Sequence, residues 1–249
     1  MGSSTISLGL GLGGGKASTI SGRPAGGGGA YANEYSVDFD GTNDQCNIDL
    51  TGLSGATAAS FSLWYNKDTS RGFANAFGSG TNGTNFIDID IRSSVIRFEC
   101  RSGGSTYVSY TQAEDIGAWH HVVAVYDASA TNKLTLYYDG SSVATSASGP
   151  TSLSSDAVAN GAIGVVLSNS WFPGLLDEAA VWNSALSASD VTAIYNSGTP
   201  ADLTSLSPVG WWRMGEDDGG TGTTITDQGS GENNGTLVNG PTFSTTVPS

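Results

Sequence analysis

Residues 117–143 read Gly-Ala-Trp-His-His-Val-Val-Ala-Val-Tyr-Asp-Ala-Ser-Ala-Thr-Asn-Lys-Leu-Thr-Leu-Tyr-Tyr-Asp-Gly-Ser-Ser-Val. Two runs rich in Val, Tyr, Trp and Leu flank a short polar stretch, and this pattern predicts a long antiparallel hairpin. Alternation along the first run places Trp119, His121, Val123 and Val125 on one face and His120, Val122, Ala124 and Tyr126 on the other. Both faces are largely apolar. We therefore expect the hairpin inside a sandwich, in a sheet that is covered on both sides.

The composition is typical of an all-β protein. The 249 residues include 36 Gly, and the apolar residues fall in short runs between turn-forming residues. The chain has 23 Asp and Glu but only 9 Lys and Arg, with a formal net charge of −14. Such a surface repels phosphate backbones, so nucleic-acid binding is not expected. The acidity suits either an exposed, colloidally stable surface or a cation-binding one.

Targeting and redox signals are sparse. No apolar run approaches the roughly 20 residues of a membrane helix, so membrane insertion is not expected. The N-terminal stretch also lacks the basic start and the continuous apolar core of a secretory signal. Cys46 and Cys100 lie on predicted strands, and either a cross-strand disulfide or two free buried thiols fits the pattern.

Residues 1–30 differ from the rest of the chain. Aliphatic residues alternate with Ser and Gly before a glycine tract, at the positions Ile6, Leu8, Leu10 and Leu12. One interpretation is a disordered tail. The other is a docking arm that adds a strand to a neighbouring subunit, with its glycines allowing close backbone approach. The regular aliphatic register favours the arm, so we expect a homo-oligomer with assembly partners.

Residues 31–249 show the regular strand spacing of a sandwich. Beyond the hairpin, strands are predicted at residues 35–39, 60–66, 86–92, 95–101, 106–111, 162–167 and 171–182. A short helix is predicted near residues 187–197, because Ser187 can cap it, Asp190 lies three residues on, and Gly198 can end it.

Several of these stretches resemble one family. They are similar to motifs of laminin-G-like domains in the concanavalin A-like lectin/glucanase superfamily. The motifs are Trp-His-His-Val and Lys-Leu-x-Leu-Tyr-x-Asp-Gly in the hairpin, Phe-Asp-Gly-Thr-Asn-Asp at residues 39–44, and Gly-Leu-Leu-Asp-Glu-Ala at residues 174–179. The resemblance implies an all-β, two-sheet antiparallel jelly-roll sandwich.

Residues 209–243 resemble a segment that usually opens such domains. Either a second, truncated domain begins there, or the sandwich is circularly permuted. About 40 residues do not build an independent core without metal or disulfide support. We therefore predict one permuted sandwich over residues 31–249.

Catalytic patterns are incomplete. The resembled glucanases carry alternate acidic residues on one strand, and Asp88 and Asp90 share a face, but Arg92 stands where a third acid would be. Asp177 and Glu178 are neighbours, which on a regular strand point to opposite faces. We predict no catalytic residues and no enzymatic activity. We also expect one of the two adjacent histidines to pack within the sandwich and the other to sit across the sheet.

Two kinds of binding residue are candidates. Oxygen-rich turns suit calcium, which the resemblance also implies at loop ends, and the candidate ligands are Asp40, Asp44, Asp177 and Asp227. The same residue types occur in ordinary tight turns. For sugar binding, an aromatic ring in a loop can stack on a pyranose. The candidates are Phe73, in the loop of residues 71–83, and Trp171 and Phe172, in the loop of residues 168–174.

Three functions fit these observations, and they are given from the most to the least favoured. The first is a non-enzymatic virion structural protein, such as a phage capsid decoration, fibre or tail component. It would be anchored by its arm and would display a lectin-like sandwich on the virion surface that binds host-surface glycans. The resemblance to sandwich domains on phage particles supports this function. The alternatives are a carbohydrate-binding module of a secreted or cell-surface protein and an atypical glycoside hydrolase.

Overall fold

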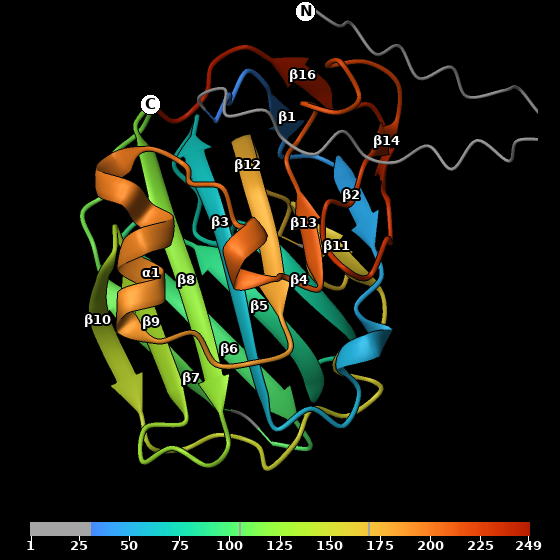
Figure 1. The fold of residues 1–249 in the computed structure, drawn as a ribbon. Coiled ribbons are helices and arrows are strands. Elements are labelled where there is room, and N and C mark those ends of the chain that lie inside the picture. Colours follow the sequence, from blue (N-terminus) through green and yellow to red (C-terminus); the bar gives the residue numbers. More distant parts are fainter. Residues whose placement is uncertain (1–30, 105, 169) are drawn as a thin grey trace, which may run out of the picture. The chain divides into compact units, whose positions relative to one another are not determined.

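A computed structural model describes residues 31–104, 106–168 and 170–249. Residues 1–30, and with them the predicted docking arm, lie outside the described residues. Residues Asn33–Ser249 form one compact unit. Within this unit, two antiparallel sheets of eight strands pack face to face (Figure 1). The prediction of an all-β, two-sheet sandwich is confirmed.

Sheet A contains the predicted hairpin. Its order is β10 (Ser141–Ser146), β9 (Leu134–Tyr138), β8 (Trp119–Asp127), β3 (Ala58–Lys67), β12 (Pro173–Trp182), β1 (Ser36–Asp40) and β16 (Thr242–Ser244), and β13 (Gly210–Trp212) also pairs with β12. Strand β8 lies between β9 and β3, as expected of a strand that is apolar on both faces. Sheet B covers one face of β8, and helix α1 lies over the other (Figure 1).

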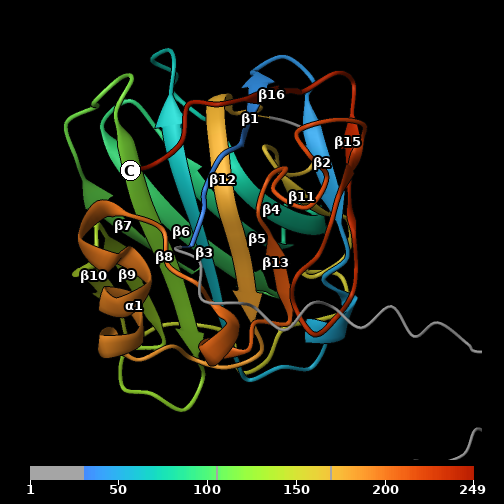
Figure 2. The same ribbon diagram turned by 45° about the horizontal axis from the view of Figure 1, so that its top comes forward.

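Sheet B forms the second layer. Its order is β14 (Thr224–Ile225), β15 (Gly235–Val238), β2 (Gln45–Ile48), β11 (Gly161–Ile163), β4 (Asn75–Asn82), β5 (Asn85–Ile91), β6 (Val95–Ser102) and β7 (Tyr107–Thr111). The C-terminal strands enter both sheets, since β13 and β16 join sheet A while β14 and β15 join sheet B. Figure 2 shows β15 beside β2, near the edge of the sandwich.

Strand β4 was not predicted. The sequence predicts a loop over residues 71–83, but most of these residues form a strand between β11 and β5. Glycine obscures the strand pattern there because the packing requires it: a Cβ at Gly78 would come within 2.4 Å of the Val166 Cβ. Strand β11 is also shorter than predicted, because the chain turns at Gly164, where φ is 93°.

Four short helical segments complete the described part of the fold: η1 (Thr51–Leu53), α1 (Ala188–Tyr195), η2 (Asn196–Gly198) and η3 (Thr204–Leu206). Helix α1 begins with the predicted capping box, in which Ser187 and Asp190 bond reciprocally. The helix ends earlier than predicted, because Asn196 already takes the left-handed conformation, at φ 46°. Asn tolerates this conformation better than most residues, so Gly198 is not needed to end the helix.

Aromatic rings join the two layers. Phe61 of sheet A lies 5.3 Å from Phe77 and 6.3 Å from Phe98 of sheet B, measured between ring centroids. All three side chains are fully buried. Rings of this size remove a large apolar area from water, so this cluster is a main source of stability between the sheets.

The two cysteines are free. Cys46 lies on β2 and Cys100 on β6, four strand positions apart in sheet B. At about 4.8 Å per strand their backbones are roughly 19 Å apart, well beyond the Cα separation of a disulfide, about 7 Å at most. Burial raises the pKa of each thiol to about 12.

The adjacent histidines occupy opposite faces of β8, as predicted. His120 faces Tyr65 and Tyr138. His121 is 1% exposed, lies beneath helix α1, and its Nε2 is 2.8 Å from the Ser62 Oγ. Burial lowers the pKa of His121 to about 3, so the imidazole is neutral in the folded protein at neutral pH.

This buried histidine gives a testable pH dependence. Below about pH 6.5 the unfolded chain protonates His121, whereas the folded chain stays neutral to about pH 3. The unfolded state therefore binds more protons in this window, and stability falls with decreasing pH by up to about 1.4 kcal/mol per pH unit from this group. We expect His121→Gln, which can still bond Ser62, to show a shallower fall in its urea midpoint between pH 6 and pH 4. Asn132→Gln, in an exposed turn and without an ionisable side chain, is the control and should keep the native slope. Equal slopes for all three proteins would contradict this assignment.

Candidate functional site

A hollow of about 220 Å³ opens on the outer face of sheet B. Along β5 and β6, alternate apolar residues such as Ile89 and Phe98 pack in the core, so the residues between them point outward. The charged residues that line this hollow, called the charged hollow below, are Asp88, Asp90, Arg92, Arg97, Glu99 and Arg101.

Cross-strand register brings these charges together. Asp88 stands opposite Glu99, and Asp90 stands opposite Arg97. No third acid stands beside Asp88 and Asp90 on β5 itself, where Arg92 takes the next outward position. Glu99 comes from the neighbouring strand β6. The alternation of Glu99 with Arg97 and Arg101 indicates a charged face on this strand. It does not indicate which strand pairs with β6.

In two of the three acids, Asp90 and Glu99, both carboxylate oxygens accept hydrogen bonds or form ion pairs. Asp90 Oδ1 accepts a hydrogen bond from the Ala74 N–H at 2.9 Å, and its Oδ2 lies 2.6 Å from the Arg92 Nε. The Glu99 oxygens lie 2.5 Å from the Arg101 Nε and 2.7 Å from an Arg97 nitrogen. These pairs fix the positions of the guanidinium groups around the hollow.

Asp88 differs from these two acids. It is 6% exposed, and its Oδ2 accepts a hydrogen bond from the Asn75 Nδ2 at 2.8 Å. Its Oδ1 is buried and has no partner among the residues that the structure describes. Burial raises the pKa of Asp88 well above its usual range, and the neighbouring Asp90 and Glu99 charges raise it further.

The three predicted sugar-binding aromatics have different surroundings. Phe73 lines the charged hollow and is 56% exposed. The Arg92 guanidinium lies 4.3 Å from its ring centroid. Trp171 is partly buried, and its backbone bridges to Asn75 at the start of β4. Phe172 is fully buried, so it belongs to the core and offers no face to a sugar.

A second hollow, of about 620 Å³, lies on the outer side of β2, β11 and the end of β4. Neutral polar side chains dominate its wall, so we call it the amide hollow: Gln45, Asn47, Thr81, Asn82 and Asn160. Val165 lines the amide hollow, Val166 lines the charged hollow, and Leu167 lines both. Leu167 is 39% exposed and has a φ of 51°. No local sequence signal indicated this hollow.

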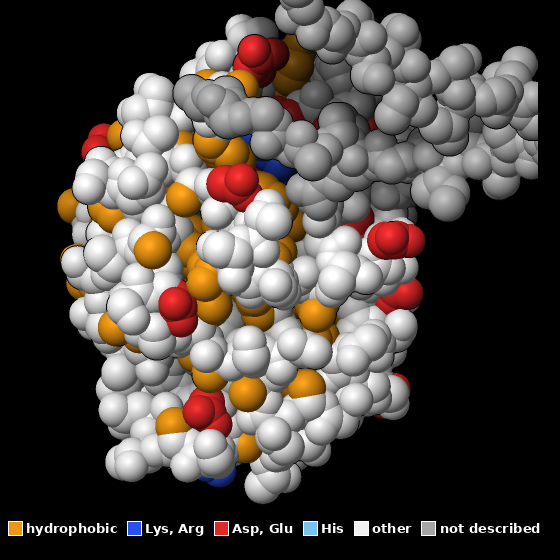
Figure 3. All heavy atoms as spheres, viewed as in Figure 1, with side chains coloured by type: hydrophobic (Ala, Val, Ile, Leu, Met, Phe, Trp, Pro, Cys, Tyr) orange, Lys and Arg blue, Asp and Glu red, His pale blue; other side chains and the backbone are white. Residues whose placement is uncertain are grey.

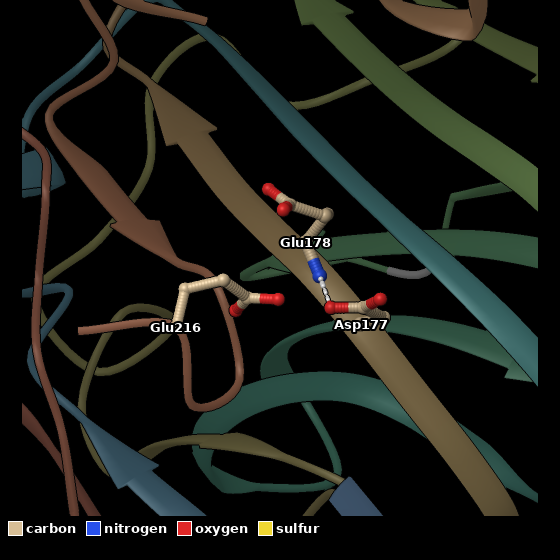
Figure 4. A group of neighbouring side chains, drawn as sticks. All are labelled: Asp177, Glu178 and Glu216. Carbon is tan, nitrogen blue, oxygen red and sulfur yellow. Dashed lines mark hydrogen bonds between the residues drawn. The ribbon is translucent and has the colours of Figure 1, made fainter. Parts of the chain in front are cut away.

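An acidic cluster lies on sheet A. Asp177 and Glu178 of β12 and Glu216, which follows β13, have carboxylate oxygens within 4.8 Å of one another (Figure 4). The expectation that Asp177 and Glu178 point to opposite faces is wrong here. Pairing with β3 shifts register after Asp177, and Glu178 has a φ of 47°, so the strand bulges. Glu216 was not predicted, because nothing local links it to β12.

The cluster is buried and strongly hydrogen-bonded. Glu178 accepts from the Trp211 Nε1 at 2.7 Å and from the Arg213 Nε at 3.0 Å. Asp177 accepts hydrogen bonds from the Asn33 Nδ2 and the Glu178 N–H. Glu216 accepts hydrogen bonds from the Glu34 and Tyr35 N–H groups. Burial and the Glu178 charge raise the pKa of Asp177. Burial is also the main cause that raises the pKa of Glu216, to about 7.

The donor set of this cluster fits a hard cation. It consists of oxygens, and two buried oxygens, Glu216 Oε2 and Asn33 Oδ1, have no partner within the described parts of the chain. Calcium takes six to eight oxygen ligands and tolerates irregular geometry. Asp177, Glu216 and Asn33 would supply part of such a shell, whereas the Glu178 oxygens already accept bonds from Trp211 and Arg213.

The other three predicted calcium ligands organise turns. Asp40 Oδ1 accepts from the Thr42 N–H at 2.7 Å, and Asp44 Oδ2 accepts from the Asp40 N–H. Asp227 accepts three backbone N–H bonds, from Trp211, Gly229 and Asn233. Among the described residues, only Asp177 of the four belongs to a cluster of three acids. On the face seen in Figure 3, acidic side chains are dispersed among uncharged ones.

Comparison with known families identifies the fold. The family model described as the concanavalin A-like lectin/glucanases superfamily matches residues 40–192. The chain belongs to this superfamily. Superfamily membership covers lectins as well as glucanases, so it does not by itself decide between binding and hydrolysis. A search of curated protein sequences gave no match.

Solved structures share the superfamily sandwich. One is a protein from Bacteroides ovatus proposed to bind carbohydrate, at 19% identity and a TM-score of 0.69, with 88% of this chain and 62% of that chain covered. This chain thus spans under two thirds of that protein. Another is the CBM40 domain of the Ruminococcus gnavus IT-sialidase, bound to α2,3-sialyllactose. It has 16% identity and a TM-score of 0.51, with 64% of this chain and 96% of that chain covered. The chain has the fold of lectin-like, carbohydrate-binding sandwiches.

The described residues contain no helix that is long and apolar enough to cross a bilayer.

Proposed function

We propose that this chain is a non-enzymatic glycan-binding sandwich and that the glycan lies over the charged hollow. The observation that carries the proposal is Phe73, a ring that is 56% exposed at the edge of a hollow lined by polar groups. Sugars bind by stacking their C–H face on an aromatic ring while fixed polar groups bond their hydroxyls. Both elements of such a site are present together here.

The polar groups of the charged hollow are rigid before any ligand binds. Arg92 pairs with Asp90 at 2.6 Å and also packs on the Phe73 ring. Arg101 pairs with Glu99 and donates to the Gly83 carbonyl at 2.6 Å. Side chains that are already ordered lose little entropy on binding, which favours affinity.

The same contacts favour binding over hydrolysis. Glycosidases use two carboxyl groups, one that donates a proton and one that attacks or activates water. In the charged hollow, Asp90 and Glu99 already use both oxygens in hydrogen bonds and ion pairs. The two fold neighbours, a protein proposed to bind carbohydrate and a domain bound to α2,3-sialyllactose, also support binding.

Removing the Phe73 ring tests the proposal. We expect a glycan array to give at least one binder, and Phe73→Ala to weaken binding to that glycan about tenfold, from the loss of roughly 1.4 kcal/mol of stacking. Titration calorimetry measures the change. Ile116→Ala removes another exposed apolar side chain, at 44% exposure and outside the lining of the hollow, and should bind like the native protein. Equal affinities for the native and Phe73→Ala proteins, or sugar release during incubation, would refute the proposal.

The proposal includes a calcium ion at the acidic cluster, where it would balance buried negative charge and stiffen the junction of β12 with the segment after β13. We expect calcium chloride to raise the thermal midpoint of the native protein. A ligand at 100 times its Kd adds about 2.7 kcal/mol. Asp177→Asn and Glu216→Gln should abolish this rise. Asp40→Asn, in an exposed turn, is the matched control and should retain it. A native midpoint that is the same in calcium and in EDTA would remove calcium from the proposal.

We also propose that the sandwich is displayed by a larger assembly, as a capsid decoration, fibre or tail component on a virion surface. Support comes from the sequence alone. The alternating aliphatic residues of positions 6–12 suit a strand added to a neighbouring subunit, and the acidic composition suits an exposed particle surface.

Deleting residues 1–30 tests this display. The compact unit Asn33–Ser249 remains whole in the shortened chain. We expect full-length protein to form homo-oligomers by light scattering and to co-purify with its assembly, and the shortened chain to stay monomeric while still binding glycan. Identical monomers for both chains would contradict the display model and would favour a carbohydrate-binding module of a secreted or cell-surface protein.

A further inference from the structure

Positive charge is concentrated at the charged hollow. The whole chain has 9 Lys and Arg against 23 Asp and Glu, yet three of these nine, Arg92, Arg97 and Arg101, line this one hollow. In so acidic a protein the placement is unusual, because each arginine would otherwise reduce charge repulsion elsewhere on the surface.

The carboxylates of the hollow leave many of the guanidinium N–H groups unused. Each guanidinium carries five N–H donors. The described contacts of Arg92 engage its Nε, those of Arg97 engage Nη2, and those of Arg101 engage Nε and Nη1. The Arg97 Nε is buried and has no partner in the described part of the chain. By contrast, Asp90 and Glu99 are occupied on both oxygens.

Asp88 adds to this excess of donors. Its Oδ1 has no partner within the described residues although the side chain is more than nine-tenths buried. Burial and the Asp90 and Glu99 charges raise its pKa, against the opposing effect of Arg97 and Arg92. A protonated Asp88 would donate a hydrogen bond and would leave the hollow with three guanidinium groups against two carboxylates.

We infer that the charged hollow selects saccharides that carry a carboxylate, such as uronic or sialic acid units, over neutral saccharides. This inference rests on the proposed function of the hollow in glycan binding. The unengaged donors suit an acceptor-rich ligand, and a carboxylate presents two oxygens in the geometry that a guanidinium fork bonds best. Phe73 stacks on the sugar ring, while Arg97 and Arg101, both on β6, receive the acid group.

The experiment compares matched probes. Uronic acid oligosaccharides and their carboxyl-reduced counterparts, with identical linkages, are titrated into the full-length protein by calorimetry. We expect the acidic member of a pair to bind at least about tenfold more tightly, the difference that one charge-assisted contact gives. We also expect this preference to shrink as salt is raised. Neutral probes that bind as tightly as the acidic ones would overturn the inference.

Substitutions in the charged hollow test whether its arginines cause the preference for acidic saccharides. Arg97→Gln should reduce binding of the acidic probe about tenfold and weaken binding of the neutral probe by a clearly smaller factor. Arg101→Gln is a second variant with a more exposed side chain, 26% against 17%, in case Arg97→Gln does not fold. Arg71→Gln makes the same charge change at an exposed position outside the lining of the hollow and should retain the preference. Acid-selective binding that survives both hollow variants would overturn the inference.

The outcomes separate the inference from the proposed function. Binding of neutral and acidic probes with equal affinity, lost in Phe73→Ala, would leave the glycan-binding proposal intact and reject only acid selectivity. Absence of binding to every probe and to the glycan array would reject both.

Discussion

The strict alternation of side chains along β5 and β6 is the constraint on which the rest of the molecule depends. Ile87, Ile89 and Ile91 must face the core, and this requirement turns Asp88 and Asp90 outward. A slip by one residue would bury both acids between the sheets, at a cost that no nearby partner offsets. The core therefore sets the register, and the register in turn builds the charged hollow.

The fold was largely predictable from local pattern. The β8 and β9 hairpin, the sandwich and the capped helix α1 follow from residue periodicity, turn residues and the Ser187 and Asp190 pair. Strand β4 escaped prediction because Gly78 must admit Val166 at close range, and glycine is a poor strand signal. Burial of Phe172 was missed because Pro173 and Gly174 follow it, and these residue types favour turns.

The candidate sites were only partly predictable, because each depends on contacts between distant segments. Asp88, Asp90, Phe73 and Asp177 could be singled out from the sequence. Glu99 reaches Asp88 only through the register between β5 and β6, and Glu216 reaches Asp177 only because the chain returns beside β12 after β13. The bulge at Glu178 breaks the alternation on which the sequence argument relied.

The spacing of the two cysteines has a consequence for where this sandwich can exist. Cys46 and Cys100 are fully buried, free and four strands apart, and the chain has no other cysteine. Its stability thus depends on packing and hydrogen bonds, with no covalent cross-link to form or to lose. Thiols that are buried and hard to ionise also react slowly with oxidants. The same folded state is accordingly available in a reducing cell interior and in oxidising surroundings outside the cell.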